Sequence, residues 1–443
     1  MIQVSPFDST LFNPLLSDEE TGALFNDEAF IKAMLHTEGA LAKAQAAAGM
    51  LPDSAARAIS QAAESLSLDP SRLAQGTASA GVPVPALVKQ LKAHLADENA
   101  KWVHYGATSQ DIVDTAAVLI LKEVIAISEV RLKRVIHSLA ALAKAHEHTL
   151  VAGRTRTQQA VPMSFGIKVA QWLSPLLRQL ERLEQLKPRL LKTQLAGAVG
   201  TLAAMGEYAV DTGHHFADAL GLECGDNWHT QRDSFVEWSS WSSMTTGLLG
   251  KMAQDWLWMS STECAEIRFT NGGGSSTMPQ KCNPVNAETI VAIMRLNAGW
   301  CGQMHQAMMH EHERSGSQWT QEWFILPNQC MGLNVALRHT QEALEHIVIN
   351  TEQMLTNLSA FNGVIYAEAI TFELASSLGR DTAAAMVKEA SQAAIRGEGH
   401  LFDLIKTKTG HAIDTERLQS SLVSAGATTP WFHQILAHAD QLT

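Results

Sequence analysis

The chain has 443 residues, 46% of them hydrophobic, and a formal net charge of −12, as in an ordinary globular protein with more than one core. No cluster of Lys and Arg is present, and because phosphate binding needs concentrated positive charge, we expect no nucleic-acid partner. No run of about 18 apolar residues and no basic, apolar leader occurs, so we expect a cytoplasmic protein with no membrane partner.

The five cysteines are odd in number and show no spacing typical of a metal site. We therefore expect reduced thiols, which fits the cytoplasm, and no bound metal.

Prolines are absent from residues 86–161, 189–278 and 285–326, which leaves room for very long helices. Ahead of these stretches, residues 28–48 predict a helix ended by Gly49 and Pro52. The next helix is expected to begin near Ser109 as its N-cap, because an apolar stripe with helical spacing follows: Leu121, Val124, Leu132, Val135, Leu139 and Leu142.

Further along the chain, leucines between 173 and 190 predict a second long helix, with a kink at Pro175. Residues 234–267 predict a third, and a fourth is expected to open at Pro284 and run to about His312. After Phe361 the pattern returns to shorter helices separated by glycines. Few segments alternate with period two, so the fold class is expected to be all-α.

Helices of this length usually pack as a bundle. We expect three domains: residues 1–100 as a small helical domain, 101–355 as a central bundle of very long helices, and 356–443 as a C-terminal helical domain.

One polar block is rich in groups that bind and protonate a carboxylate. Residues 272–274 are all glycine and precede Ser275 and Ser276, and Lys281 follows. Asn283 and Pro284 suit the N-cap and first position of a helix, whose N-terminus attracts anions. A serine on a glycine-hinged loop above such a site would be placed to exchange a proton with the carbon next to the carboxylate.

Residues 274–284, Gly-Ser-Ser-Thr-Met-Pro-Gln-Lys-Cys-Asn-Pro, resemble the signature of the fumarase/aspartase superfamily at every fixed position. Two more blocks, 104–111 (His-Tyr-Gly-Ala-Thr-Ser-Gln-Asp) and 153–158 (Gly-Arg-Thr-Arg-Thr-Gln), resemble its first and second motif regions in the right order. The resemblance covers nearly the whole chain.

The resemblance implies a central bundle that assembles as a homotetramer, with each active site built from three subunits. It implies that Ser275 transfers the proton, that Lys281 and Asn283 hold the carboxylate whose charge builds up, and that His104, Thr108, Ser109 and Thr155 bind the substrate. Gln158 and Ser276 are expected to support the site. No cofactor is implied.

At one position the sequence departs from the superfamily pattern, and this departure limits the reactions that we expect the chain to catalyse. Lyases of the superfamily that move water or an amine usually carry histidine at the position of Arg156, oriented by a glutamate that is retained here as Glu288. Arg156 cannot act as an acid or base near neutrality. The group that adds to or leaves the β carbon should therefore need no proton, as is true of a carboxylate.

Within the superfamily, this chemistry resembles the cofactor-free cycloisomerases of bacterial aromatic degradation, which close a lactone ring in a small tricarboxylate. Residues 84–91 and 228–233 resemble the same branch. Such a substrate would use Arg156 as an extra cation, with or without help from Glu288.

Two rival hypotheses stay open. One is a lyase that releases an amine, resembling adenylosuccinate lyase, and the other is a non-catalytic structural protein on the same scaffold. Structural interpretations also stay open for single residues. His104 would be a satisfied structural histidine, Thr108 and Ser109 a helix cap, Arg232–Asp233 a surface ion pair, and the charges of Glu311, Glu313 and Arg314 a solvated helix end.

Overall fold

A computed structural model describes residues 5–274, 277–423 and 428–442. The chain groups into two compact units, each made of three segments. Unit 1 holds residues 1–131, 179–247 and 292–338, and unit 2 holds residues 132–178, 248–291 and 339–443. The expected division into three domains stays a prediction.

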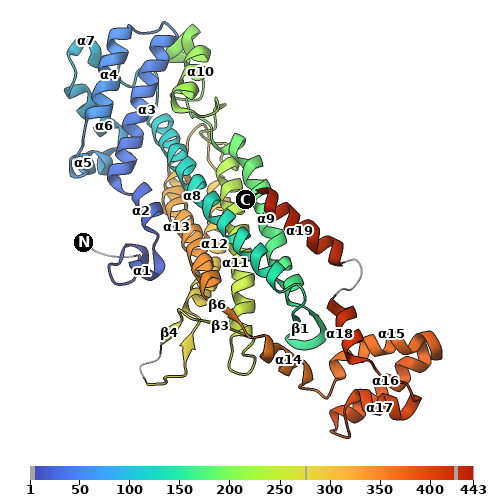
Figure 1. Cartoon of the computed structure of the whole chain (residues 1–443). Coiled ribbons are helices and arrows are strands. Elements are labelled where there is room, and N and C mark those ends of the chain that lie inside the picture. The colour runs from blue at the N-terminus through green and yellow to red at the C-terminus, as the bar shows by residue number, and fades with distance from the viewer. Residues whose placement is uncertain (1–4, 275–276, 424–427, 443) are drawn as a thin grey trace. The chain divides into compact units, whose positions relative to one another are not determined.

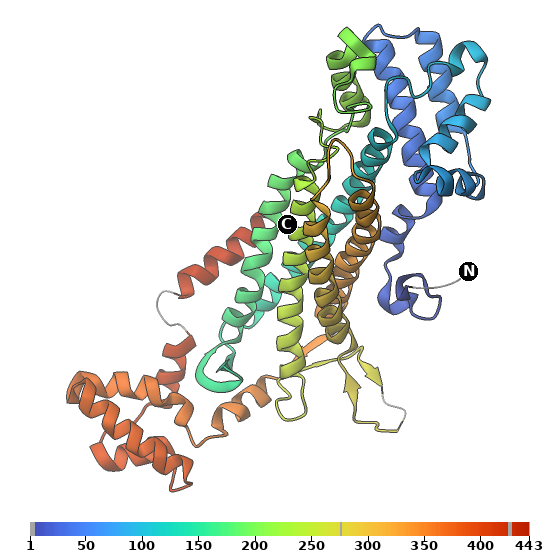
Figure 2. The same ribbon diagram turned by 180° about the vertical axis from the view of Figure 1, so that it is seen from behind.

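Five long helices contribute to both units: α8 (Ser109–Ala145), α9 (Phe165–Leu190), α11 (Asp233–Met259), α12 (Val285–Ala307) and α13 (Gly316–His346). Figure 1 and Figure 2 show these helices running side by side. Within unit 1, Trp241 Nε1 of α11 donates to the Gln179 carbonyl of α9 at 2.9 Å, and Gln329 Nε2 of α13 donates to the Ser239 carbonyl of α11 at 3.0 Å. Within unit 2, Trp172 Nε1 of α9 donates to Asp255 Oδ2 of α11 at 2.7 Å. The expected all-α fold with very long helices is confirmed.

The remaining helices of unit 1 are α1 (Asn13–Leu16), α2 (Glu19–Leu24), α3 (Asp27–Ala47), α4 (Asp53–Ser65), α5 (Ser71–Ala80), α6 (Val84–Ala93), α7 (Asp97–Ala100) and α10 (Ala209–Leu220). Asn26 caps α3 by accepting from Ala29 N. The helix then buries an apolar face that includes Met34, Leu35 and Leu41 in a core shared with α4, α6 and the start of α8. The predicted helix over residues 28–48 is confirmed.

The remaining helices of unit 2 are α14 (Thr351–Ser359), α15 (Ala367–Leu378), α16 (Arg380–Ile395), α17 (Leu401–Thr409), α18 (Thr415–Val423) and α19 (Thr428–Leu442). Helices α15 to α18 share an apolar core with Leu150 and Ala152. Short helices after Phe361 are thus confirmed.

Unit 2 also contains three antiparallel two-stranded sheets, which the sequence did not predict. They pair β1 (Leu150–Thr155) with β2 (Gln158–Ser164), β3 (Ile267–Phe269) with β6 (Ile347–Ile349), and β4 (Gly273–Gly274) with β5 (Cys282–Asn283). Strands β3 to β6 have only two or three residues and are too short to produce a visible alternation. Strands β1 and β2 have six and seven residues, but their buried and exposed positions do not alternate regularly.

Three helix boundaries differ from the predictions. Helix α11 ends at Met259, eight residues before the predicted end, because the chain turns and enters β3. Helix α12 begins at Val285, so Asn283 lies in β5 and Pro284 takes the capping position, one residue later than predicted. Helix α12 ends at Ala307, before the predicted His312, and α13 then continues through Pro327 to His346.

A proline inside a helix removes one backbone donor. Beside Pro327, the Asn328 side chain donates to the Phe324 carbonyl at 2.7 Å, which satisfies one backbone oxygen at this point. Pro175 likewise lies within the continuous α9, and the expected kink there stays a prediction.

In the described part of the chain, no helix combines the length and the apolar content that a membrane crossing requires.

Candidate active site

The first motif block lies in unit 1, in the turn that leads into α8. Ser109 is the first residue of the helix, so the N-cap position belongs to Thr108 and not to Ser109 as predicted. Neither hydroxyl has a hydrogen-bond partner among the described residues. Instead the Thr108 backbone N–H donates to Asp111 Oδ2 at 2.9 Å, the return half of a capping box. The cap is therefore made by Asp111, and both hydroxyls remain open for other partners.

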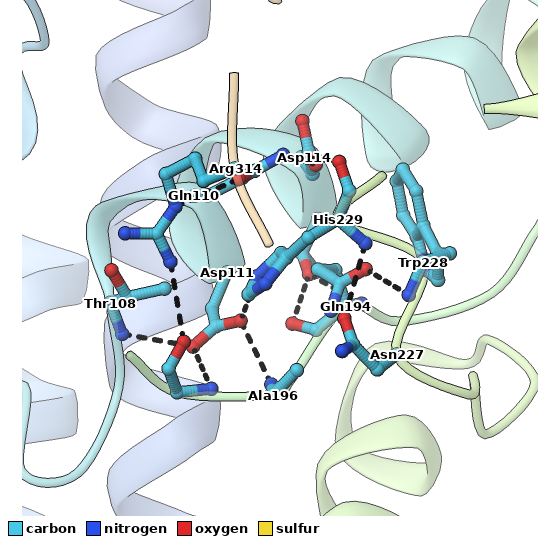
Figure 3. Close-up of polar contacts among 12 residues, drawn as sticks. Thr108, Gln110, Asp111, Asp114, Gln194, Ala196, Asn227, Trp228, His229 and Arg314 are labelled. Carbon is cyan, nitrogen blue, oxygen red and sulfur yellow. Dashed lines mark hydrogen bonds and ion pairs between the residues drawn. The ribbon is translucent and has the colours of Figure 1, made fainter. Parts of the chain in front are cut away.

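Asp111 is the centre of the network around this turn, as Figure 3 shows. Its side chain is fully buried and accepts from the backbone N–H groups of Ala196 and Gly197 at 2.9 and 3.0 Å. His229 Nε2 lies 2.8 Å from Asp111 Oδ1. With Thr108, four donors from three segments converge on one carboxylate, which compensates for the loss of its hydration. Asp111 thereby joins the start of α8 to the 196–197 loop.

Gln110 and Arg314 hold the same loop from the other side (Figure 3). Arg314 Nε donates to Gln110 Oε1 at 3.0 Å, and Arg314 Nη2 donates to the carbonyls of Gly197 and Ala198 at 3.3 and 3.0 Å. Gln110 Nε2 donates to Asp114 Oδ2 at 3.1 Å and to the His229 carbonyl at 2.9 Å. Arg314 is exposed, as a solvated charge would be, but its guanidinium also makes three specific hydrogen bonds to Gln110 and the 197–198 carbonyls.

Arg232 is buried, so the surface ion pair with Asp233 considered from the sequence is also wrong. Its guanidinium donates to Asp114 at 2.7 and 3.2 Å and to Glu322 at 2.9 and 2.5 Å. Burial lowers the pKa of Arg232, but the two carboxylates raise it further, and the net pKa lies above the ordinary value. Burial likewise raises the pKa of Glu322, yet Arg232 brings it below its usual range. The network is charged and fully paired.

His104 contacts a residue that the sequence did not point to. His104 Nδ1 lies 2.7 Å from Glu38 Oε1, and the Glu38 side chain, on α3, has no exposed surface. The His104 backbone has φ 62°, an unusual value for a residue other than glycine. His104 is therefore partnered on one side, which fits a satisfied structural histidine and leaves its predicted role in substrate binding a prediction.

The second motif block forms the end of the β1–β2 hairpin in unit 2, not the end of a helix. Thr155 pairs with Gln158, and the two residues between them, Arg156 and Thr157, have φ 52° and 69°. Positive φ at both central positions is typical of a type I′ turn, which usually carries Asn-Gly. The side chains of Thr155, Arg156 and Gln158 are exposed at this tip.

The arginine of this block that forms an ion pair is Arg154. It donates to both oxygens of the buried Glu266, at 2.9 and 2.7 Å, and Glu266 Oε1 also accepts from Asn357 Nδ2 at 2.9 Å. Burial lowers the pKa of Arg154, and Glu266 raises it above the usual range. Arg156, by contrast, has no side-chain partner among the described residues.

A cavity of about 1070 Å³ borders the hairpin within unit 2. Thr157, Gln158 and Lys168 line it together with Asn357 and Phe361. Burial lowers the pKa of Lys168, and this effect outweighs the attraction of Asp255. Gln158 is thus a predicted site residue that borders this cavity.

The third motif block is a short hairpin in unit 2. Gly273 pairs with Asn283 and Gly274 with Cys282. A Cβ placed on Gly272 would lie 2.3 Å from Cys282 Sγ and 2.8 Å from the Asn283 carbonyl oxygen, so the glycine permits a close approach of the two strands. Ser275 and Ser276 lie outside the described residues.

Lys281 and Glu288 are exposed and have no side-chain partner in the described part of the chain. Asn283 lies partly buried in β5, and Glu288 lies in the first turn of α12. No hydrogen bond or ion pair links Arg156 with Glu288 within the described chain. Cys282, whose role the sequence left open, donates from Sγ to the Phe269 carbonyl at 3.2 Å.

Four residues that contact the first block were not predicted as site residues: Glu38, Asp111, His229 and Arg314. Asp111 had a visible signal, because it lies three residues after the N-cap, where a capping-box acid is expected. His229 lies in the 228–233 stretch that had been noted only for resemblance. Glu38 and Arg314 are distant in the sequence, and no local pattern marks them.

All five cysteines are unpaired, in agreement with the prediction of thiols. Within the described ranges, no three or more His, Cys, Asp or Glu side chains are grouped so as to hold a metal ion.

Comparison with known proteins gives a consistent result. A family model described as "Lyase" matches residues 17–297. The chain is 38% identical over 406 residues to the 3-carboxy-cis,cis-muconate cycloisomerase of Acinetobacter baylyi, covering 90% of each chain. It is 34% identical to the N-acetyl-S-(2-succino)cysteine lyase of Dickeya dadantii, covering 85% of this chain and 83% of the relative. The crystal structure of the 3-carboxy-cis,cis-muconate lactonizing enzyme from Pseudomonas putida matches with a TM-score of 0.91 and 34% identity, covering 98% of this chain and 100% of that one.

Proposed function

The chain belongs to the lyase family of the fumarase/aspartase superfamily, and on this premise we propose that it converts 3-carboxy-cis,cis-muconate to 4-carboxymuconolactone. The similarity to cycloisomerases extends over nine tenths of the chain, which supports a shared activity and not only a shared fold.

One observation decides among the chemistries of this superfamily. Arg156 is exposed at the hairpin tip and unpaired among the described residues, where relatives that move water or an amine place a histidine acid. An arginine keeps its proton at neutral pH, so it binds charge and transfers none. A reaction whose nucleophile is already an ionised carboxylate needs no proton transfer at that position.

In the proposed reaction, one carboxylate of the substrate attacks the carbon β to another carboxylate, forming a C–O bond and closing the lactone ring. The electron pair of the double bond moves toward the α carbon, where Ser275 delivers a proton and then regains one from solvent. The lactone acid is an isomer of the substrate acid, so apart from this solvent proton no co-reactant is consumed.

The other motif residues bind the three carboxylates. Lys281 and Asn283 hold the carboxylate on which charge develops, and an electrostatic contribution of this kind is often the largest in catalysis. The unpartnered hydroxyls of Thr108 and Ser109 and the exposed Thr155 are suited to accept further carboxylate contacts. Arg156 supplies an additional cation, and Gln158, Ser276 and Glu288 support the binding residues.

We further propose a homotetramer whose active sites each combine three subunits. Exposed apolar side chains lie on three of the long helices in unit 1, among them Met244 on α11, Leu296 on α12 and Phe324 on α13, with 44%, 50% and 72% exposure. Such side chains on bundle helices support burial by another subunit. The exposed, unpaired motif residues of the hairpins support completion of the site by neighbouring chains. The five unpaired cysteines support a cytoplasmic location.

The experiment that tests the function follows the absorbance of the conjugated diene during incubation with purified protein. We expect loss of the diene chromophore and formation of the lactone. The same protein is offered N-acetyl-S-(2-succino)cysteine and adenylosuccinate, and fumarate is measured. Release of fumarate without diene loss would replace the cycloisomerase proposal by an eliminating lyase, and no turnover of any substrate would favour a structural protein.

A further inference from the structure

In unit 1, Glu38 forms a close pair with His104 of the first motif block. Glu38 lies in the middle of α3 with its side chain fully buried, among apolar neighbours such as Leu35 and Leu41 of the same core. A carboxylate in such a place is costly unless it is paired. Its one described side-chain partner is His104, with 2.7 Å between Nδ1 and Oε1.

The second carboxylate oxygen of Glu38 gives a further reason for His104 to carry a positive charge. Glu38 Oε2 is buried and has no hydrogen-bond partner among the described residues. An ionised carboxylate only accepts, so Nδ1 of His104 must carry the hydrogen. A positive charge on the ring compensates for both oxygens, whereas a neutral ring satisfies only one of them.

The other edge of the ring faces outward. About a fifth of the His104 side chain is exposed, and Nε2 is neither partnered nor buried among the described residues. The His104 backbone is left-handed, with φ 62°, which few residues adopt without constraint. The imidazole therefore presents one nitrogen to Glu38 and leaves the other without a protein partner in the described part of the chain.

The charges around the ring come from three helices. Glu38 on α3 and, more weakly, Asp111 on α8 favour the protonated ring, whereas Lys92 on α6 and burial oppose it. Burial is the largest single effect and lowers the pKa of His104, but the two carboxylates together raise it above its ordinary value.

We propose that Glu38 is a positioning residue that holds His104 as an imidazolium with its Nε2–H free to donate to a substrate carboxylate. His104 then acts as a fixed cation and does not accept the proton of the reaction. This assignment rests on the proposed function only for the identity of the carboxylate. The orientation and charge of the ring are properties of the unliganded protein.

The first experiment needs no substrate. The imidazole resonances of the ¹⁵N-histidine-labelled full-length protein are followed against pH for wild type, Glu38→Gln and Glu64→Gln, with His104 assigned from the spectrum of His104→Gln. Glu64→Gln is the matched control, because Glu64 pairs with Lys43 on the surface. We expect His104 to titrate about 1–3 pH units lower in Glu38→Gln and unchanged in the control. An unchanged titration in Glu38→Gln overturns the proposal.

A second experiment separates positioning from a purely structural role. Glu38→Gln should lower kcat/KM about 10-fold, chiefly by raising KM, and KM of the wild type should rise as the pH increases through the pKa of His104. In a His104→Gln background, Glu38→Gln should cause no further loss of kcat/KM, because Glu38 acts through the His104 ring. Additive losses in the two backgrounds would show that Glu38 serves only the fold.

Two controls keep the outcomes distinct. If Glu38→Gln fails to fold, Glu38→Ala removes the carboxylate without leaving an amide in the core, and a His104 titration identical to that of the wild type would contradict the proposal. If the wild type does not convert 3-carboxy-cis,cis-muconate, the proposed function fails, while the imidazole titration still decides the role of Glu38.

Discussion

The first motif block and the tips of the two motif hairpins are constructed in opposite ways. Around Thr108 and Ser109, the buried Asp111 and Gln110 and the exposed Arg314 form hydrogen bonds that fix the backbone. At the hairpin tips, Arg156 and Lys281 are exposed and make no side-chain contact within the described chain. The part of the proposed site around Thr108 and Ser109 is thus held in place by contacts within a single chain. The motif residues at the hairpin tips are exposed and have no such contacts among the described residues. Substitutions in the two regions should therefore fail differently, the first in folding and the second in chemistry or assembly.

The largest effect on activity is expected from Ser275→Ala, with kcat lowered about 10²–10⁴-fold, since proton delivery by a placed group contributes that much. The thermal midpoint and the oligomeric state should stay those of the wild type. Diene absorbance, thermal unfolding and light scattering on one preparation test this. A wild-type rate for Ser275→Ala combined with a large loss for Ser276→Ala would transfer the role to the second serine.

Asp111→Asn should damage both stability and activity. The amide can accept fewer hydrogen bonds and places an NH₂ group against one or more of the four donors, so the free energy of unfolding should fall by about 3–5 kcal/mol. Urea unfolding measures the loss. Asp53→Asn, in the exposed first turn of α4, is the matched control and should change little. If Asp111→Asn were as stable as the wild type, the hydrogen bonds to Asp111 would not be needed to hold the turn at Thr108 and Ser109.

Mixing two inactive variants tests whether the hairpin tips act in different subunits. Thr155→Ala and Lys281→Ala proteins, unfolded together and reassembled in equal amounts, should recover about a quarter of the wild-type activity if each site takes these residues from two chains that assort at random. Each variant reassembled alone provides the baseline. A mixture no more active than the baseline would show that both residues serve a site within the same chain.

Arg156→Ala should raise KM about 10- to 100-fold, because a charge-assisted hydrogen bond is worth roughly 1.5–3 kcal/mol. The pH profile should keep its shape over the neutral range, since no group that titrates there has been removed. Steady-state kinetics from about pH 6 to 9 and the mass of the assembly are measured together. An unchanged KM in an intact tetramer would assign Arg156 to structure alone.

The smallest effect is expected at the neighbouring position. Thr157 is β-branched and has φ 69°, so Thr157→Gly should relieve strain and raise the free energy of unfolding by about 0.5–1 kcal/mol. Thermal unfolding measures the gain, and Thr155→Gly, in the regular strand, should lower stability instead. A loss of stability in Thr157→Gly would show that the threonine side chain makes contacts worth more than the strain.

Much of the fold was visible in the sequence because long helices leave long-range regular patterns. Absent prolines and a stripe of apolar residues predicted α8, and Gly49 and Pro52 marked the end of the helix predicted over residues 28–48, which is α3. The end of α11 and the interruption between α12 and α13 were missed, because turns such as residues 308–315 follow from tertiary packing more than from local composition.

The candidate site was predictable where its residues are adjacent in the chain and not where they meet only after folding. Thr108, Ser109 and Lys281 were found because they lie inside short motifs. Arg314 was taken for a solvated charge because its partners, Gln110 and Gly197, are more than 100 residues away. Glu38 lies 66 residues from His104 on an otherwise apolar helix face, and spacing alone carries no sign of such a contact.

The two-residue tip of the β1–β2 hairpin also limits how this protein can vary over evolutionary time. The two central residues bring Thr155 opposite Gln158, so one residue inserted between them would require another turn type and a new pairing at the tip. A substitution at Arg156 keeps the turn length and therefore this pairing. Related chains are thus free to alter their chemistry at this position by replacing the residue, while a change in the length of the turn would displace Thr155 and Gln158 relative to each other.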